Sequence, residues 1–112
     1  MTTKLAAKTC GPEHASATPL LGAAMQELLA QLDGDWRVED NHHLVRTWEF
    51  DDFKDALSFT NEVGAEAEAQ DHHPDIRLAY GEAEVTIWTH KINGLTENDF
   101  ILAARIDART GP

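Results

Sequence analysis

The sequence predicts an α+β domain in the order α-β-β-α-β-β-α, with one four-stranded antiparallel sheet and three helices packed on one face. Apolar residues recur at helical spacing in three segments and alternate at strand spacing in the segments between them. The connections inside each strand pair are short, and short connections favour antiparallel neighbours. Helices on one face of such a sheet would bury all of the apolar stripes, so we expect this arrangement.

Composition narrows the class of protein. The chain has 112 residues, which suits one compact domain, and 42% of them are apolar, enough for a core. Its net charge of −11 disfavours binding to nucleic acid and to anionic membranes, because both need clustered Lys and Arg. No apolar run reaches transmembrane length, and the one cysteine, Cys10, cannot form an intrachain disulfide. We therefore expect a cytoplasmic protein.

The first predicted element is a helix that follows a tail. Residues 1–18 are rich in Thr, Ala, Gly and Pro without a sustained period, so we expect a mobile tail before a folded domain over residues 19–112. Thr18 can cap a helix, and Pro19 suits its first position because proline lacks an N–H. Gly34 supplies the stop. The apolar face is formed by Leu21, Met25, Leu28 and Leu32.

The first strand pair and the second helix come next. Residues 36–38 can open a strand, and residues 44–50 form a second one after the turn signal Asp40-Asn41. Asp51 or Asp52 can cap a helix that continues to about Gln70. The near-helical spacing of its apolar residues predicts one buried face, made of Phe53, Ala56, Phe59, Val63 and Ala67.

The second strand pair and the last helix complete the domain. Pro74 ends the second helix, because proline disfavours helical geometry in the residue before it. Residues 76–80 and 83–90 each alternate as strands, with the core-facing positions of the latter at every second residue. A third helix is expected over residues 96–108, where Asp99 stands at the position of the acidic residue in a capping box.

Three of the six histidines lie at the ends of predicted elements, where side chains can meet. His72 and His73 follow the second helix, and His90 ends the fourth strand. If the fourth strand pairs with the third, His90 returns to the neighbourhood of the other two. Glu68 lies one helical turn before His72, and Asp99 lies in the first turn of the last helix. A pocket lined by imidazoles and carboxylates suits general acid–base catalysis.

Other interpretations of these histidines remain open from the residues alone. A His-His-Pro segment is also typical of turns and of surface histidines. Metal binding is disfavoured, because adjacent histidines in an extended segment point apart and Cys10 lies in the expected tail. We interpret His42-His43 as exposed beside a turn, and His14 as part of the tail.

A family resemblance favours the active-site interpretation. The motifs that carry it are Glu68-Ala69-Gln70-Asp71-His72-His73-Pro74, Tyr80, Thr89-His90, Gly94-Leu95-Thr96 and Asp99. In this order and at these distances they resemble the signature of the pterin-4a-carbinolamine dehydratase family. Residues 44–53 also resemble the strand-into-helix region of that family, and the likeness covers about residues 20–108.

The resemblance implies a reaction and a site. Family members remove water from a 4a-hydroxytetrahydropterin to give the quinonoid dihydropterin, without a cofactor or metal. By motif position, the acid–base group would be His72, His73 and His90. The residues that orient them or the pterin would be Glu68, Pro74 and Asp99. The resemblance also implies a dimer or a tetramer.

The C-terminal segment implies a second function. Residues 87–104 most resemble a branch of the family that includes chloroplast proteins and proteins associated with α-carboxysomes. Some members of that branch resemble assembly factors for RuBisCO. The alternative is therefore a non-catalytic chaperone with RuBisCO as its partner, linked to the carboxysome. The retained histidines and Glu68 favour the enzyme, whereas the branch resemblance favours the chaperone.

Overall fold

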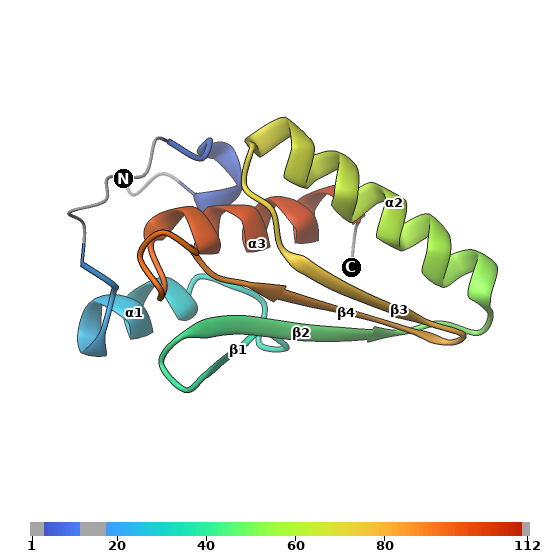
Figure 1. Ribbon diagram of the computed structural model, residues 1–112, viewed down its shortest axis with the longest axis horizontal. Coiled ribbons are helices and arrows are strands. Elements are labelled where there is room, and N and C mark those ends of the chain that lie inside the picture. The colour runs from blue at the N-terminus through green and yellow to red at the C-terminus, as the bar shows by residue number, and fades with distance from the viewer. Residues whose placement is uncertain (1–3, 12–17, 111–112) are drawn as a thin grey trace.

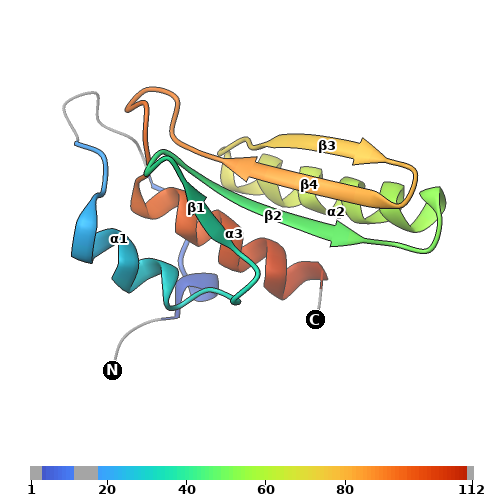
Figure 2. The ribbon, with the colours of Figure 1, turned by 90° about the horizontal axis from the view of Figure 1, so that it is seen from below.

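The predicted α+β order is confirmed in a computed structural model, which describes residues 4–11 and 18–110. Helices α2 and α3 lie side by side against one face of the antiparallel sheet, and α1 lies beside α3 (Figures 1 and 2). The described elements are η1 (Leu5–Ala7), α1 (Gly22–Leu29), β1 (Arg37–Glu39), β2 (His43–Glu49), α2 (Phe53–Gln70), β3 (Asp75–Ala79), β4 (Glu82–Ile87) and α3 (Glu97–Thr110).

The sheet has the order β1-β2-β4-β3, and all neighbouring strands are antiparallel. Its two central strands, β2 and β4, pair with each other although they come from different strand pairs. Helix α2 and strand β3 lie between them in the sequence. Leu44 lies opposite Ile87, and Asp75 lies opposite Thr86. The second pairing brings the start of β3 next to the end of β4, which matters for the site described below.

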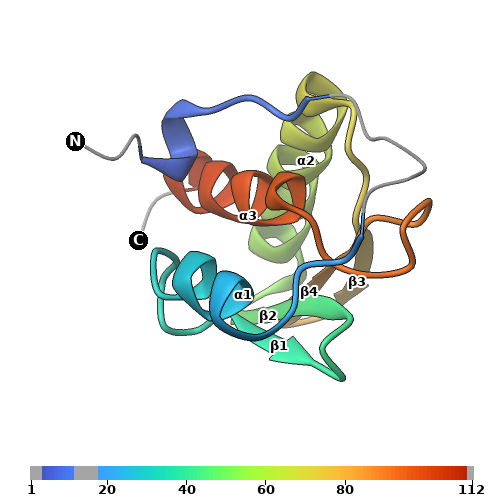
Figure 3. The same ribbon diagram turned by 90° about the vertical axis from the view of Figure 1, so that its left-hand side faces the viewer.

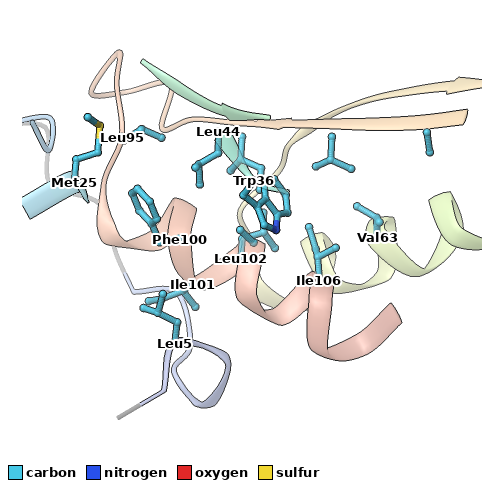
Figure 4. Packing of buried hydrophobic residues seen from close by; sticks show 14 of the residues in the cluster. Leu5, Met25, Trp36, Leu44, Val63, Leu95, Phe100, Ile101, Leu102 and Ile106 are labelled. Carbon is cyan, nitrogen blue, oxygen red and sulfur yellow. The ribbon is translucent and has the colours of Figure 1, made fainter. Parts of the chain in front are cut away.

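The hydrophobic core lies between the sheet and the helices. The alternation predicted along β4 is confirmed, since Ala83, Val85 and Ile87 are fully buried. Leu44 of β2 and Leu102 of α3 both belong to this layer (Figure 4). Burying a side chain of this size contributes about 1.5–3 kcal/mol relative to leaving it exposed. The core therefore fixes how α3 sits on the sheet.

The first helix is shorter than expected. It begins at Gly22 rather than at Thr18-Pro19, because Leu20 donates its N–H to the carbonyl of Leu95 at 2.7 Å and the chain stays extended through Leu21. Leu21 is 60% exposed, so it does not belong to the buried face that the spacing predicted. The helix also ends at Leu29, and tighter turns follow it.

The second helix matches its prediction at both ends. Asp52 is the N-cap, and its side chain accepts the N–H of Asp55 at 2.9 Å. At the other end, Asp71 adopts a left-handed conformation with φ 52°. Its N–H still bonds to the last carbonyls of the helix, as in a left-handed C-cap. The chain therefore leaves the helix just before His72 and turns toward the sheet.

The fourth strand ends earlier than expected. Regular pairing stops at Ile87, and only an isolated bridge joins Thr89 to Gly94. Between these bridge partners the chain makes a turn that contains Asn93 in a left-handed conformation, φ 55°. His90 therefore lies in this turn and not at the end of the strand.

Residues 4–11 differ from the mobile tail that we expected. Leu5 is buried in the core, and Arg105 donates to the carbonyls of Ala6 and Lys8 at 3.1 and 2.9 Å. The N–H of Cys10 donates to Gln70 Oε1 at 2.9 Å. The segment thus runs beside α3 to the end of α2 (Figure 3). Residues 1–3 and 12–17 of the expected tail, including His14, lie outside the described residues.

None of the helices in the described part of the chain combines the length and the apolar character that a membrane span requires.

Candidate active site

The three histidines predicted to meet line one pocket of about 250 Å³. His72 and His73 come from the connection between α2 and β3, and His90 comes from the turn after β4 (Figure 1). The antiparallel pairing of β3 with β4 places these two connections at the same end of the sheet. The other lining residues are Asp71, Trp88 and Lys91.

His72 forms the buried side of the pocket. Its Nε2 lies 2.6 Å from Asp99 Oδ1, and the Asp99 side chain is fully buried. The second carboxylate oxygen, Oδ2, accepts from the Thr96 N–H at 2.8 Å and from the Thr89 hydroxyl at 2.9 Å. A carboxylate can only accept, so the His72 ring carries a proton on Nε2. Asp99 thereby fixes both the orientation of the ring and its tautomer.

The bond between Asp99 and the Thr96 N–H also bears out half of the predicted capping box. In the full motif, the capping hydroxyl would accept a backbone N–H. Here the Thr96 hydroxyl lies 2.9 Å from the Thr89 hydroxyl instead. Asp99, in the first turn of α3, therefore both accepts the Thr96 N–H and holds His72, which ties the site to the helix.

His73 forms the open side of the pocket. Its Nε2 lies 2.6 Å from Glu68 Oε2, and the two side chains are 54% and 78% exposed. The expectation that the adjacent histidines point apart is met, because His72 bonds to α3 and His73 bonds back to α2. One imidazole is thus buried and fixed, and the other is in contact with solvent.

The ring of His90 packs against the ring of Trp88. Its ring centroid lies 4.4 Å from that of Trp88, at an interplanar angle of 55°. Trp88 was not among the residues expected in the site. The signal for it was its place in the alternation of residues 83–90, which puts it on the same face as His90. Lys91 was also missed, although it follows His90 directly.

The remaining expected residues lie around the pocket. Glu68 and Asp99 do not line it and instead bond to two histidines that do. Pro74 is half-buried and follows His73, where its ring restricts the backbone. Imidazoles that are oriented by carboxylates and open to a pocket can donate and accept protons near neutral pH.

No group of three or more His, Cys, Asp or Glu side chains among the described residues is arranged to hold a metal ion.

The fold and the histidine pocket define a small α+β protein equipped for acid–base chemistry. The sequence model of the family described as "Pterin 4 alpha carbinolamine dehydratase" matches residues 18–109, which is most of the chain. The chain therefore belongs to the pterin 4 alpha carbinolamine dehydratase family.

Relatives from several bacteria have a similar length and a similar sequence. The chain is 50% identical over 104 residues to a protein of Rubrobacter xylanophilus named "Putative pterin-4-alpha-carbinolamine dehydratase", covering 93% of this chain and 96% of the relative. It is 49% identical over 102 residues to a protein of the same name from Halorhodospira halophila, covering 90% of this chain and 93% of the relative.

Two solved structures share the fold. A transcriptional coactivator/pterin dehydratase from Brucella melitensis superposes with a TM-score of 0.76 at 36% identity, covering 84% of this chain and 100% of that chain. A pterin dehydratase-like protein identified as a RuBisCO assembly factor in the alpha-carboxysome superposes with a TM-score of 0.58 at 23% identity, covering 69% of this chain and 90% of that chain. At that identity the second likeness shows the fold alone.

Proposed function

We propose that this protein is a pterin-4a-carbinolamine dehydratase, a hydro-lyase that converts a 4a-hydroxytetrahydropterin into the quinonoid dihydropterin. The observation that carries the proposal is the single pocket lined by His72, His73 and His90 in a member of this family. Relatives of similar length that bear the dehydratase name support it.

The protein has to supply only proton transfers for this reaction, because the substrate supplies the electrons. The lone pair of the ring nitrogen next to C4a forms the new C=N bond while the C4a–O bond breaks. The leaving hydroxyl takes up one proton to depart as water, and a ring N–H loses one, so no net proton is consumed. Two imidazoles of different protonation can perform both transfers, each accelerating the step by about 10²–10⁴-fold.

The site residues divide into two roles in this proposal. His72, His73 and His90 exchange protons with the pterin and are the catalytic residues. Asp99 orients His72, and Glu68 orients His73, through the 2.6 Å contacts described above. Pro74 stiffens the backbone that presents the two adjacent histidines. The proposal needs no metal or cofactor, because the ring nitrogen supplies the electrons.

The proposal is tested with His73→Ala and His90→Ala in the full chain. Each should slow turnover by about 10²–10⁴-fold, the scale for losing one positioned acid or base. Both side chains are exposed, so the free energy of unfolding should change little. Lys54→Ala is the matched control, since Lys54 is exposed on α2 and lies outside the pocket. Turnover that survives both histidine changes would contradict the proposed roles.

The second candidate is a RuBisCO assembly factor that retains a silent pocket, with a place in or near the carboxysome. The resemblance of residues 87–104 to the carboxysome-associated branch favours it. RuBisCO assembly should be measured on the same variants. If this candidate is correct, the histidine changes leave assembly intact, whereas charge reversal on the acidic surface impairs it through lost electrostatic complementarity. Wild-type protein with full assembly activity and no dehydratase activity would refute the enzyme proposal.

We also propose that the protein is a cytoplasmic homo-oligomer. Strands β1 and β3 are the edges of the sheet, and pairing across subunits would cover their unpaired backbone groups. Sedimentation at micromolar concentration should then detect a dimer or a tetramer, and a monomer alone would contradict this proposal.

A further inference from the structure

Four rings lie one beside the next, from the pocket to the turn between β1 and β2. His90 lies against Trp88 at 4.4 Å between ring centroids, Trp88 lies 5.5 Å from His42, and His42 lies 5.4 Å from His43. Aromatic rings at such distances attract each other beyond the area they bury. His42 comes from the turn between β1 and β2, so this row joins two loops that are far apart in the sequence.

His42 also bonds directly to the turn that carries His90. Its Nε2 lies 2.9 Å from Asn93 Oδ1. Asn93 closes this turn, because its N–H donates to the carbonyl of His90 at 3.2 Å and its φ is 55°. His42 thus contacts the turn twice, through Trp88 near its start and through Asn93 at its end.

The hydrogen bonds around His42 have one consistent direction. The amide oxygen of Asn93 can only accept, so His42 donates from Nε2, and a neutral His42 ring then has a bare Nδ1. That Nδ1 lies 3.1 Å from His43 Nδ1, which must donate. His43 Nε2 lies 3.5 Å from Glu39 Oε1, which can only accept, so His43 makes this second contact only when both of its ring nitrogens carry protons. The neighbouring His43 therefore fixes the tautomer in which His42 can hold Asn93.

We propose that His42 is a positioning residue that braces the 90–93 turn and thereby holds His90 at the pocket. This inference rests on the proposed dehydratase function, in which His90 exchanges protons with the pterin. His90 is itself exposed and lies outside regular secondary structure, so its placement depends on contacts from other elements. A displaced catalytic group loses rate steeply, by up to about 10²-fold for 1 Å.

The test separates the hydrogen bond from the ring contact. His42→Phe keeps a ring against Trp88 and removes the donor, whereas His42→Gln keeps an N–H donor toward Asn93. Asn93→Gly removes the acceptor and tolerates the left-handed conformation. Asn41→Gly is the matched control, because Asn41 precedes His42, is exposed and has a φ of 53°.

We expect His42→Phe and Asn93→Gly to lower kcat by about 10-fold each, with KM within about twofold of wild type. The double variant should be no slower than either single variant, since both changes break one bond. His42→Gln should restore most of kcat, and Asn41→Gly should leave it unchanged. Equal losses in the control variant, or additive losses in the double variant, would overturn the inference.

A second measurement does not depend on activity. Backbone NMR order parameters of residues 90–93 should fall from the rigid value of about 0.85 in His42→Phe and return toward it in His42→Gln. If wild-type protein shows no turnover, the proposed function fails, and these order parameters alone decide the bracing. Unchanged order parameters in His42→Phe would overturn it.

Discussion

Asp99→Asn changes the chemistry of the site with almost no change in shape. In the wild-type protein one carboxylate oxygen accepts from His72, and the other accepts from the Thr96 N–H and the Thr89 hydroxyl. The Thr96 N–H can only donate, so the asparagine oxygen must remain on that side. The asparagine NH₂ then faces His72 Nε2, which must become an acceptor. The proton of the neutral His72 ring therefore moves to Nδ1.

Asp99→Asn should lower both kcat and the free energy of unfolding, and the contacts of Asp99 give the size of each change. An acid–base histidine in the wrong tautomer should lower kcat by about 10²–10⁴-fold. Charge-assisted hydrogen bonds contribute about 1.5–3 kcal/mol each and neutral ones about 0.5–1.5 kcal/mol. Asp99 accepts from three donors, so the variant should lose about 1–1.5 kcal/mol of unfolding free energy for each contact that becomes neutral. Asp99→Ala removes the acceptor that His72, Thr89 and Thr96 share and should cost about 2–6 kcal/mol.

The assay combines steady-state dehydration kinetics, urea unfolding and the ¹⁵N NMR shifts of the His72 ring. We expect Asp99→Asn to remain folded, to lose turnover and to show the proton of His72 on Nδ1. A variant that keeps the wild-type tautomer, or that retains turnover within about threefold despite the changed tautomer, would refute this role of Asp99.

Two predictions concern the rest of the domain. Hydrogen bonds from Arg105 and Gln70 outweigh burial and lower the pKa of Glu66 below its ordinary 4.5. The unfolded chain therefore binds the proton first as pH falls, so the stability that Glu66 contributes is present above that value and is lost as pH falls through the lower folded pKa. Urea unfolding from about pH 7 to about pH 3 should show this loss in wild type and not in Glu66→Gln, and a pH-independent difference between the two would contradict it. Leu102→Ala removes a fully buried side chain beneath the sheet and should lower the unfolding free energy by about 2–5 kcal/mol, whereas the exposed Leu21→Ala should change it by less than about 0.5 kcal/mol. Similar losses in the two leucine variants would show that the core is not where the structure has it.

Local signals predicted the parts of the fold that depend on neighbours in sequence. Asp52 caps α2 as expected, because a cap is a contact with a residue only three positions away. The alternation along β4 predicted its buried face, since burial of one face repeats every second residue. The same alternation gave no sign that regular pairing stops at Ile87. A turn follows this point, and Asn93 closes it in a left-handed conformation.

Contacts between distant segments were beyond reach of the sequence. Leu21 fits the helical spacing but lies outside the helix, because the preceding residue bonds to the carbonyl of Leu95 and Leu21 itself is extended. His42 was interpreted as exposed, yet it bonds to Asn93, 51 residues away. Cys10 was expected in a tail, yet its N–H bonds to Gln70, 60 residues away. Each of these three hydrogen bonds forms only when the fold has brought the two segments together.

The central claim is that the histidine pocket dehydrates a pterin carbinolamine. The most direct test is a stopped-flow measurement of water loss from a 4a-hydroxytetrahydropterin with wild-type protein at substoichiometric concentration. The account predicts many turnovers per chain, a rate proportional to protein concentration and saturation with substrate. A rate equal to the spontaneous one at every protein concentration would contradict it.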